Sequence, residues 1–298
     1  MNRRTFLTSS LVLPAIGLAT GAYATVIEPR RLAITRYALQ PDQWPRDMPL
    51  RIVAIADIHM APPFMTLERL SGIVEAANAL NPDIVVLLGD YAEEKHVVSG
   101  AVSSQKTAAL LSELRAPLGR WAVMGNHDWA SDPQARRDRA PRTHWHDAFE
   151  AHGIEVLSNR AAKRSLLGRS FWIAGLESQL AYCDGGDDLE GTLAQIEDAA
   201  PVLLLAHEPD IFARMSSRVA LTLCGHTHGG QVRLFGRAPI VPSRYGERYA
   251  YGHIVEADRH LVVSAGLGCS RLPIRFGVPP ELVVIDLGAR ASLLATMA

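Results

Sequence analysis

Nine residues between Asp57 and His228 carry side chains of the types that bind metal ions or transfer protons. They form five short groups: Asp57-Ile58-His59, Gly89-Asp90, Gly125-Asn126-His127-Asp128, Ala206-His207-Glu208-Pro209 and Gly225-His226-Thr227-His228. Each group directly follows a short apolar run, such as RIVAIA before Asp57 and PVLLLA before His207. An apolar run that stops at such a residue indicates a buried strand with a ligand at its carboxyl end. Five ligand-bearing strands of this kind predict that the ligands meet in one site.

The donor atoms of this set are nitrogen and oxygen, without sulfur. Such a mixture suits Mn, Fe or Zn better than Mg or Ca, which prefer oxygen ligands alone. Asp90 has two carboxylate oxygens and can bridge two cations, and two cations about 3.5–4 Å apart promote in-line displacement at phosphorus. Asp57 and His59, like His226 and His228, are two positions apart, so in extended backbone they point the same way. The pattern therefore predicts a dinuclear transition-metal site.

His127 lies between Asn126 and Asp128, and we assign it no metal. A histidine beside the metals can protonate a leaving oxygen or stabilise charge on a phosphoryl group. Asp128 can fix the tautomer of that histidine. Arg271 and Arg275, near the end of the chain, either clamp a phosphate or pair with a carboxylate.

Strand and helix patterns alternate through most of the chain. The periodicity predicts helices at 66–80, 106–114 and 143–152, and strands at 30–39, 154–158, 170–176, 201–206, 219–224, 261–265 and 281–286. His144 and His146, in the third helix, are expected on its surface. Strands dominate the last third, and the order predicts a mixed α/β sandwich with ligands gathered where strands end.

The composition is that of a folded globular protein. The chain has 298 residues, 48% hydrophobic and 20% charged, with a formal net charge of −1. A large core is therefore possible, and the absence of a basic excess argues against a general nucleic-acid binder. Cys183, Cys224 and Cys269 are odd in number and far apart, so they predict neither a disulfide framework nor a cysteine metal site.

The N-terminus has the pattern of an export signal. Arg3 and Arg4 precede an uncharged stretch that continues to Glu28, with small residues at Ala22-Tyr23-Ala24. The arginine pair resembles a twin-arginine signal. Residues 5–27 are also long enough for a membrane anchor, which needs about 20 residues, and either reading places residues 28–298 as a folded domain outside the cytoplasmic membrane. The export machinery is then a partner.

These motifs together resemble the signature of the calcineurin-like metallophosphoesterases, in order and spacing across residues 51–230. The segments GHTHGGQVRLFG, SRYGERYAYG and AGLGCSRLPIRFGVPPELVVIDL are similar to those of an exported or membrane-associated bacterial branch of this superfamily. The resemblance implies a four-layer αββα sandwich. It also implies that one metal is bound by Asp57, His59, Asp90 and His228. The other metal then shares Asp90 and adds Asn126, His207 and His226. His127 is the implied catalytic histidine. Glu93 departs from the family pattern, which often has an aspartate there.

Two classes of function are compatible with this resemblance. One is a metal-dependent phosphohydrolase, and the other is a non-catalytic scaffold of the same fold. A scaffold is expected to lose ligands or the catalytic histidine, and this chain retains them all, so we expect the enzyme. Export favours a phosphodiesterase acting on an envelope or lipid-linked phosphoester. A UDP-2,3-diacylglucosamine-type pyrophosphate hydrolase is the alternative.

Overall fold

Two six-stranded sheets form the centre of the molecule in the computed structural model, which describes residues 17–93, 102–182 and 185–289. The first sheet has the order β1-β12-β2-β3-β4-β5. Its strands are β1 (Ala33–Leu39), β12 (Glu281–Leu287), β2 (Leu50–Ile55), β3 (Ile84–Leu87), β4 (Arg120–Ala122) and β5 (Glu155–Val156). β2, β3, β4 and β5 are mutually parallel, whereas β12 runs antiparallel to β2.

The second sheet has the order β10-β11-β9-β8-β7-β6. Its strands are β10 (Gly252–Glu256), β11 (Arg259–Val263), β9 (Val219–Cys224), β8 (Val202–Leu205), β7 (Arg169–Gly175) and β6 (Arg160–Leu166). The four inner strands are parallel, and each edge strand is antiparallel to its neighbour.

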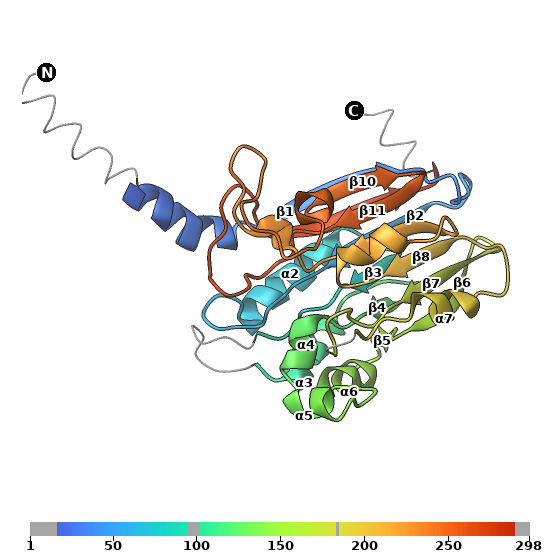
Figure 1. The fold of residues 1–298 in the computed structure, drawn as a ribbon, viewed down its shortest axis with the longest axis horizontal. Coiled ribbons are helices and arrows are strands. Elements are labelled where there is room, and N and C mark those ends of the chain that lie inside the picture. Colours follow the sequence, from blue (N-terminus) through green and yellow to red (C-terminus); the bar gives the residue numbers. More distant parts are fainter. Residues whose placement is uncertain (1–16, 94–101, 183–184, 290–298) are drawn as a thin grey trace, which may run out of the picture.

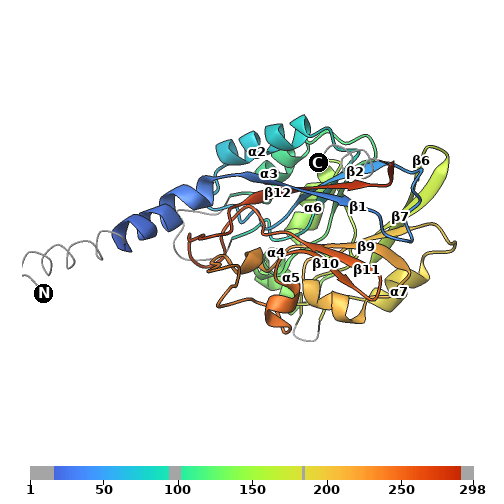
Figure 2. The ribbon, with the colours of Figure 1, turned by 90° about the horizontal axis from the view of Figure 1, so that it is seen from above.

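Helices cover the outer faces of both sheets, which gives the expected four-layer αββα sandwich (Figure 1, Figure 2). The first sheet is covered by α2 (Leu67–Ala79), α3 (Ser104–Leu111) and α6 (His144–Ala151). The second sheet is covered by α7 (Leu189–Ala194) and the short turns η3 (Pro209–Arg214) and η5 (Gly246–Tyr249). Alternate strand residues face opposite ways, so Ile52 joins the core between the sheets while Val53 packs under α2.

The structure confirms the expected helices and all seven expected strands, with shifts of a few residues at their ends. The edge strands β6 and β10 did not appear among those expectations. β6 has the sequence RAAKRSL and is half exposed along its length, so it lacks the apolar run that marks a buried strand. Charged side chains on an edge strand discourage pairing with another chain.

The chain before β1 is also part of the packed structure. The short turns η1 (Tyr23–Ile27) and η2 (Glu28–Arg30) contact the loop that follows β11. The backbone N–H of Arg275 donates to the carbonyl of Ala24 at 2.9 Å, and that of Val278 donates to the buried carboxylate of Glu28 at 2.7 Å. Packing thus extends upstream of residue 28. Among the described residues, no helix has the length and apolar character needed to cross a bilayer. The Arg3-Arg4 pair lies outside the described residues.

Candidate metal centre

The predicted ligands meet because the strands before them are parallel neighbours. β2, β3 and β4 lie side by side in one sheet, and β8 and β9 lie side by side in the other. All five deliver their ligands at the carboxyl end. Backbone bonds join the loops that follow, since the N–H groups of Asp57 and His59 donate to the carbonyls of Gly89 and Asp90, each at 3.0 Å. The two sheets thus contribute to one site.

The ligands do not lie on extended backbone, as their two-residue spacing had suggested. Asp57, His59, Asp90, His226 and His228 all have positive φ angles, between 46° and 72°. The left-handed conformation is uncommon for residues other than glycine and is found mostly where tertiary structure enforces it. The expectation of extended backbone is therefore wrong. At each ligand the backbone instead turns sharply as it leaves the strand.

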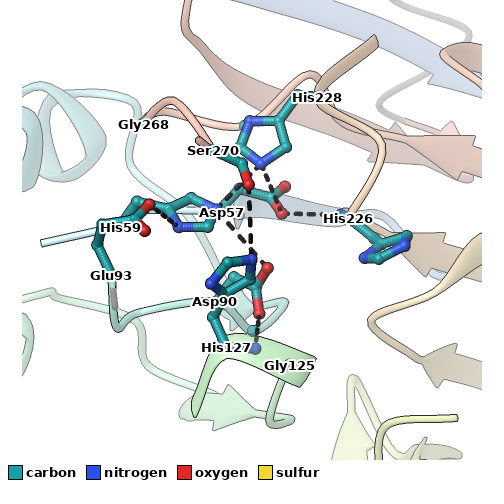
Figure 3. Close-up of polar contacts among 12 residues, drawn as sticks. Asp57, His59, Asp90, Glu93, Gly125, His127, His226, His228, Gly268 and Ser270 are labelled. Carbon is teal, nitrogen blue, oxygen red and sulfur yellow. Dashed lines mark hydrogen bonds and ion pairs between the residues drawn. The ribbon is translucent and has the colours of Figure 1, made fainter. Parts of the chain in front are cut away.

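One group of ligand atoms is formed by Asp57, His59 and His228, which point toward one another in Figure 3. His59 Nε2 lies 3.0 Å from His228 Nε2, and His228 Nε2 lies 3.7 Å from Asp57 Oδ1. Gly225 makes room for this group, because a Cβ there would lie 2.6 Å from Asp57 Oδ2.

The second group is formed by Asp90, His207 and His226. His207 Nε2 lies 3.2 Å from Asp90 Oδ2 and 3.3 Å from His226 Nδ1. The same Oδ2 atom lies 3.6 Å from His59 Nε2 of the first group. Asp90 Oδ1 instead accepts the backbone N–H of His127 at 2.8 Å. One oxygen of Asp90 is therefore shared between the two groups, whereas its second oxygen is held by the backbone.

Polar contacts on the far side of the imidazoles orient the rings of His59, His207 and His226. His207 Nδ1 donates to the carbonyl of Leu88 at 2.7 Å, and His59 Nδ1 lies 3.1 Å from the carboxylate of Glu93. The ring of His226 bonds to the backbone of Pro242. Such bonds fix the tautomer that leaves a lone pair for a metal. Glu93 therefore supplies the orienting carboxylate despite its departure from the family pattern.

Two of the imidazoles are held in the neutral form that binds metal. Burial lowers the pKa of His226 to about 3 and holds that of His228 well below its usual value, so both rings are neutral. Burial also opposes charge on His207, but the Asp90 carboxylate outweighs it and raises the His207 pKa well above the usual value. Burial raises the pKa of Asp57 to about 6. A divalent cation held by Asp90 and His207 would take the place of a proton on His207, so metal binding here would be weakened by acid.

Two buried oxygens show that the site fits cations. Asp57 Oδ2 and Asn126 Oδ1 are buried and, within the described chain, accept no hydrogen bond. A buried polar atom without a partner is costly, and both atoms belong to residues expected to bind metal. With four imidazoles and three carboxylates nearby, this donor set suits divalent metal ions.

Asp128 has a different role from the one expected. Its two oxygens accept four backbone N–H groups, those of Gly125, Asp90, Tyr91 and Ala92, at 2.8–3.0 Å. It therefore fastens the Asp90 loop to the start of α4 (Asn126–Ala130) and does not orient His127. Adjacent residues of a helix point in different directions, so the sequence neighbours do not share a partner. Asp128 is a positioning residue for Asp90 and Asn126.

His127 lies at the boundary between the metal ligands and an open cleft of about 780 Å³. Its ring packs edge-on against His59, with centroids 4.8 Å apart, and its Nε2 lies 3.5 Å from Ser270 Oγ. Sequence reasoning missed Ser270, which lies beside the predicted Arg271. Arg271 is exposed on the cleft wall, together with Tyr182 and Arg136. A substrate in the cleft thus meets His127 and Arg271.

Arg275 does not face the cleft. Its guanidinium is fully buried and donates to the carbonyls of Ala265 at 2.7 Å and Gly268 at 2.5 Å. It also makes a longer hydrogen-bond contact, 3.3 Å, with His228 Nδ1. The expectation that it binds phosphate or a carboxylate is wrong. Without Arg275, these loop carbonyls would lack a hydrogen-bond donor. The loop itself packs against His228.

His146 is buried, contrary to the surface position expected for it. Its Nδ1 accepts the N–H of Thr143 at 3.0 Å, and its Nε2 lies 2.9 Å from Ser158 Oγ. The carboxylate of Glu177 lies beside this ring and accepts the indole N–H of Trp129, on α4, at 2.7 Å. This cluster braces the short helix that carries Asn126 and His127. His144 is exposed, as expected.

Comparison with known proteins places this fold and site in one family. The sequence profile of the family described as "Calcineurin-like phosphoesterase" matches residues 50–230, which include every candidate ligand. The chain belongs to the calcineurin-like phosphoesterases. It is a metal-dependent phosphoester hydrolase, and the family and the ligand groups indicate divalent metal ions.

Relatives match along almost the whole chain. The uncharacterized metallophosphoesterase YkuE of Bacillus subtilis (strain 168) is 32% identical over 96% of this chain and 98% of its own. Phosphodiesterase YaeI of Escherichia coli (strain K12) is 28% identical over 96% of this chain and 99% of its own. A 5'-nucleotidase precursor from Thermus thermophilus has a structure that matches 83% of this chain with 15% identity and a TM-score of 0.46. The chain spans 58% of that structure.

Replacing Asp90 should remove metal from both groups. Asp90→Ala deletes the oxygen shared by His59 and His207, so we expect loss of metal from both ligand groups, measured by elemental analysis of purified protein. Asp42→Ala, in an exposed loop, is the matched control and should keep the wild-type content. Full metal content in Asp90→Ala would contradict the shared-oxygen assignment.

Replacing Asp128, which does not itself line the cleft, should destabilise the same metal site. Asp128→Asn converts one acceptor oxygen into a donor that opposes two backbone N–H groups. Each unsatisfied group costs about 1–3 kcal/mol, so thermal unfolding should occur at lower temperature and metal affinity should fall. Asp42→Asn controls for loss of charge. Normal stability and metal content with selective loss of catalysis would instead show that Asp128 acts through His127.

Proposed function

We propose that this protein is a phosphodiesterase that hydrolyses an envelope or lipid-linked phosphoester with two divalent transition-metal ions, Mn, Fe or Zn. The observation that carries the proposal is the position of Asp90 Oδ2, 3.6 Å from His59 Nε2 and 3.2 Å from His207 Nε2. A single carboxylate oxygen between two imidazole-containing groups is placed to bridge two cations. His127 and an open cleft lie beside it.

The residues of each group divide between the two ions as the family pattern implies. Asp57, His59 and His228 would hold the first, whereas Asn126, His207 and His226 would hold the second, with Asp90 common to both. When bound, two such ions polarise the phosphoryl group and make water a stronger nucleophile near neutral pH. The protein supplies no nucleophile of its own in this scheme.

His127 supplies the proton. Its backbone N–H is fixed by Asp90 Oδ1, and its Nε2 faces Ser270 at the cleft. An imidazole held there can donate a proton to the leaving oxygen of the ester. Arg271, across the cleft wall, can neutralise a phosphate oxygen.

The cleft supports a diester in preference to a small monoester. Its volume of about 780 Å³ far exceeds that of a phosphate group, and apolar side chains such as Leu180 and Ile240 line it with the polar ones. A relative over the full length is named phosphodiesterase YaeI. The alternative, a UDP-2,3-diacylglucosamine-type pyrophosphate, is favoured by Arg271, which offers a cation for a second phosphate.

We also propose that the protein is exported in folded form through the twin-arginine route and stays attached through the part of residues 5–27 that precedes the packed turn at Tyr23. The uncharged stretch supports an anchor. Retention is supported by the burial of Ala24 and its bond to Arg275, which cleavage after Ala24 would remove. Export of a folded chain allows metal loading before transit.

The role of His127 predicts a separation of metal binding from catalysis. His127→Ala should keep wild-type metal content and lose about 10²–10⁴-fold in kcat/KM, the range for an acid–base group. The loss should be largest for an alkyl diester, whose leaving alkoxide needs the proton, and smaller for a nitrophenyl diester. His144→Ala, at an exposed position, is the control. An active His127→Ala enzyme on both substrates would refute the assignment.

The export proposal predicts retention of a variant inside the cell. Replacing Arg3 and Arg4 with lysine keeps the charge but removes the arginine pair that the export route reads. Cell fractionation should then find the variant in the cytoplasm and the wild type outside it. Unchanged export of the lysine variant would exclude this route.

A further inference from the structure

Three chain segments join into one surface beside the catalytic cleft, which we call the rim face: residues 23–31, 232–244 and 268–278. Backbone bonds link them in sequence. Arg275 N–H donates to Ala24, and Arg233 N–H donates to Phe276 at 2.7 Å. The ring of Phe276 also meets that of Tyr23 edge-on, with centroids 6.2 Å apart. The rim face is therefore one continuous surface despite its origin in distant parts of the chain.

Large apolar side chains are concentrated on the rim face. Of the twelve exposed large hydrophobic residues among those the structure describes, six lie on it. They are Val26, Ile27, Leu234, Phe235, Ile240 and Leu272. Single exposed apolar residues are ordinary, but a gathering of this kind marks an interaction surface.

Phe235 is the most prominent of these residues. It is fully exposed, at the tip of a tight turn that is closed by bonds between Leu234 and Arg237 at 2.8 and 3.0 Å. Its φ of 52°, followed by 80° at Gly236, defines a turn position that favours Asn or Gly. A bulky aromatic residue there is unfavourable both in backbone conformation and in exposure to water. Such a combination is expected where the side chain enters another phase.

The charge of the rim face is strongly positive. Its three segments contain seven arginines and one acidic residue, Glu28, which is buried, whereas the whole chain has a net charge of −1. Arg233 pairs with Glu247 at 3.1 Å, and Arg275 is buried. Among the described residues, no carboxylate pairs with the exposed Arg30, Arg31, Arg237 or Arg271. Apolar tips among free arginines are complementary to a surface of anionic headgroups over acyl chains.

The rim face is also continuous with the cleft and with the N-terminal segment. Ile240 and Arg271 belong to both the rim face and the cleft wall. The helix that precedes Tyr23 leaves the molecule at this end (Figure 2). A surface that contacts the rim face would therefore lie beside the mouth of the cleft and beside the uncharged N-terminal segment.

We propose that the rim face docks on an anionic phospholipid bilayer, with Phe235 and Leu272 inserted among the headgroups and the arginines against their phosphates. Docked in this way, the cleft opens toward the membrane surface, so its substrate is a phosphoester carried by an amphiphile in that surface. The substrate class rests on the proposed function, whereas the docking does not.

Tryptophan placed at the turn reports insertion directly. The five native tryptophans are all at most 8% exposed, so a new one at the surface dominates the response to solvent. The full chain with Phe235→Trp is mixed with vesicles of brominated phosphatidylcholine, with or without phosphatidylglycerol. We expect a larger blue shift and stronger quenching with the anionic lipid than with phosphatidylcholine alone, which the N-terminal anchor can reach without the arginines. Arg31→Glu with Arg237→Glu should weaken this by at least about tenfold, and added salt should weaken it further.

Leu167→Trp is the matched control. Leu167 is 72% exposed, has a φ of 52° and precedes a glycine in the β6–β7 turn, at the opposite end of the second sheet. Quenching of the tryptophan at 235 that does not exceed that at 167 would overturn the proposal. A blue shift that needs no vesicles and grows with protein concentration would overturn it too, in favour of contact between copies. Quenching needs no turnover, so failure of the phosphodiesterase assay is a separate result.

Discussion

The carboxylate of Asp90 is the point on which the site depends. It is 1% exposed, and burial alone would disfavour its charge, yet the imidazoles of His207 and His127 hold its pKa well below the usual value. Asp128 ties its loop to α4 through four backbone bonds, and the His127 N–H fixes one of its oxygens. The remaining oxygen is thereby aimed between the two ligand groups. Burying so much charge is costly unless cations compensate it.

The positions of the ligands could be predicted because each follows an apolar run, and those runs are buried parallel strands whose ends converge. The directions in which the ligand side chains point could not be predicted from the sequence. Asp57 and His228 reach their neighbours through left-handed backbone, which is imposed by loops of other strands and leaves no local pattern. For the same reason Asp128, next to His127 in sequence, turned out to support Asp90. Sequence spacing reports proximity along the chain, whereas bonding partners come from tertiary packing.

The cleft walls were the least predictable part of the molecule. Ser270 and Arg271 reach the cleft because their loop is held on one side by Gln231, which bonds to both backbone groups of Ser270, and on the other by Glu28. These partners are separated from the loop by dozens to hundreds of residues. The half-exposed edge strands β6 and β10 escaped prediction for a related reason, since their stability comes from the neighbouring strand and their own sequences lack an apolar run.

The buried Arg275 links the loop beside the metal site to the N-terminal segment. It holds the carbonyls of Ala265 and Gly268 from inside, while its own backbone N–H bonds to Ala24 in the N-terminal segment. The loop that carries Ser270 and Arg271 is therefore held in two ways. The Arg275 guanidinium bonds to its carbonyls beside the metal site, and the Arg275 backbone N–H bonds to the N-terminal segment. Displacement of the N-terminal segment breaks the bond to Ala24 and the bond between Val278 and Glu28, but leaves the guanidinium bonds in place. Its effect should therefore fall on the cleft wall and substrate binding, and leave the metal ligands, which are held by the sheets, in place.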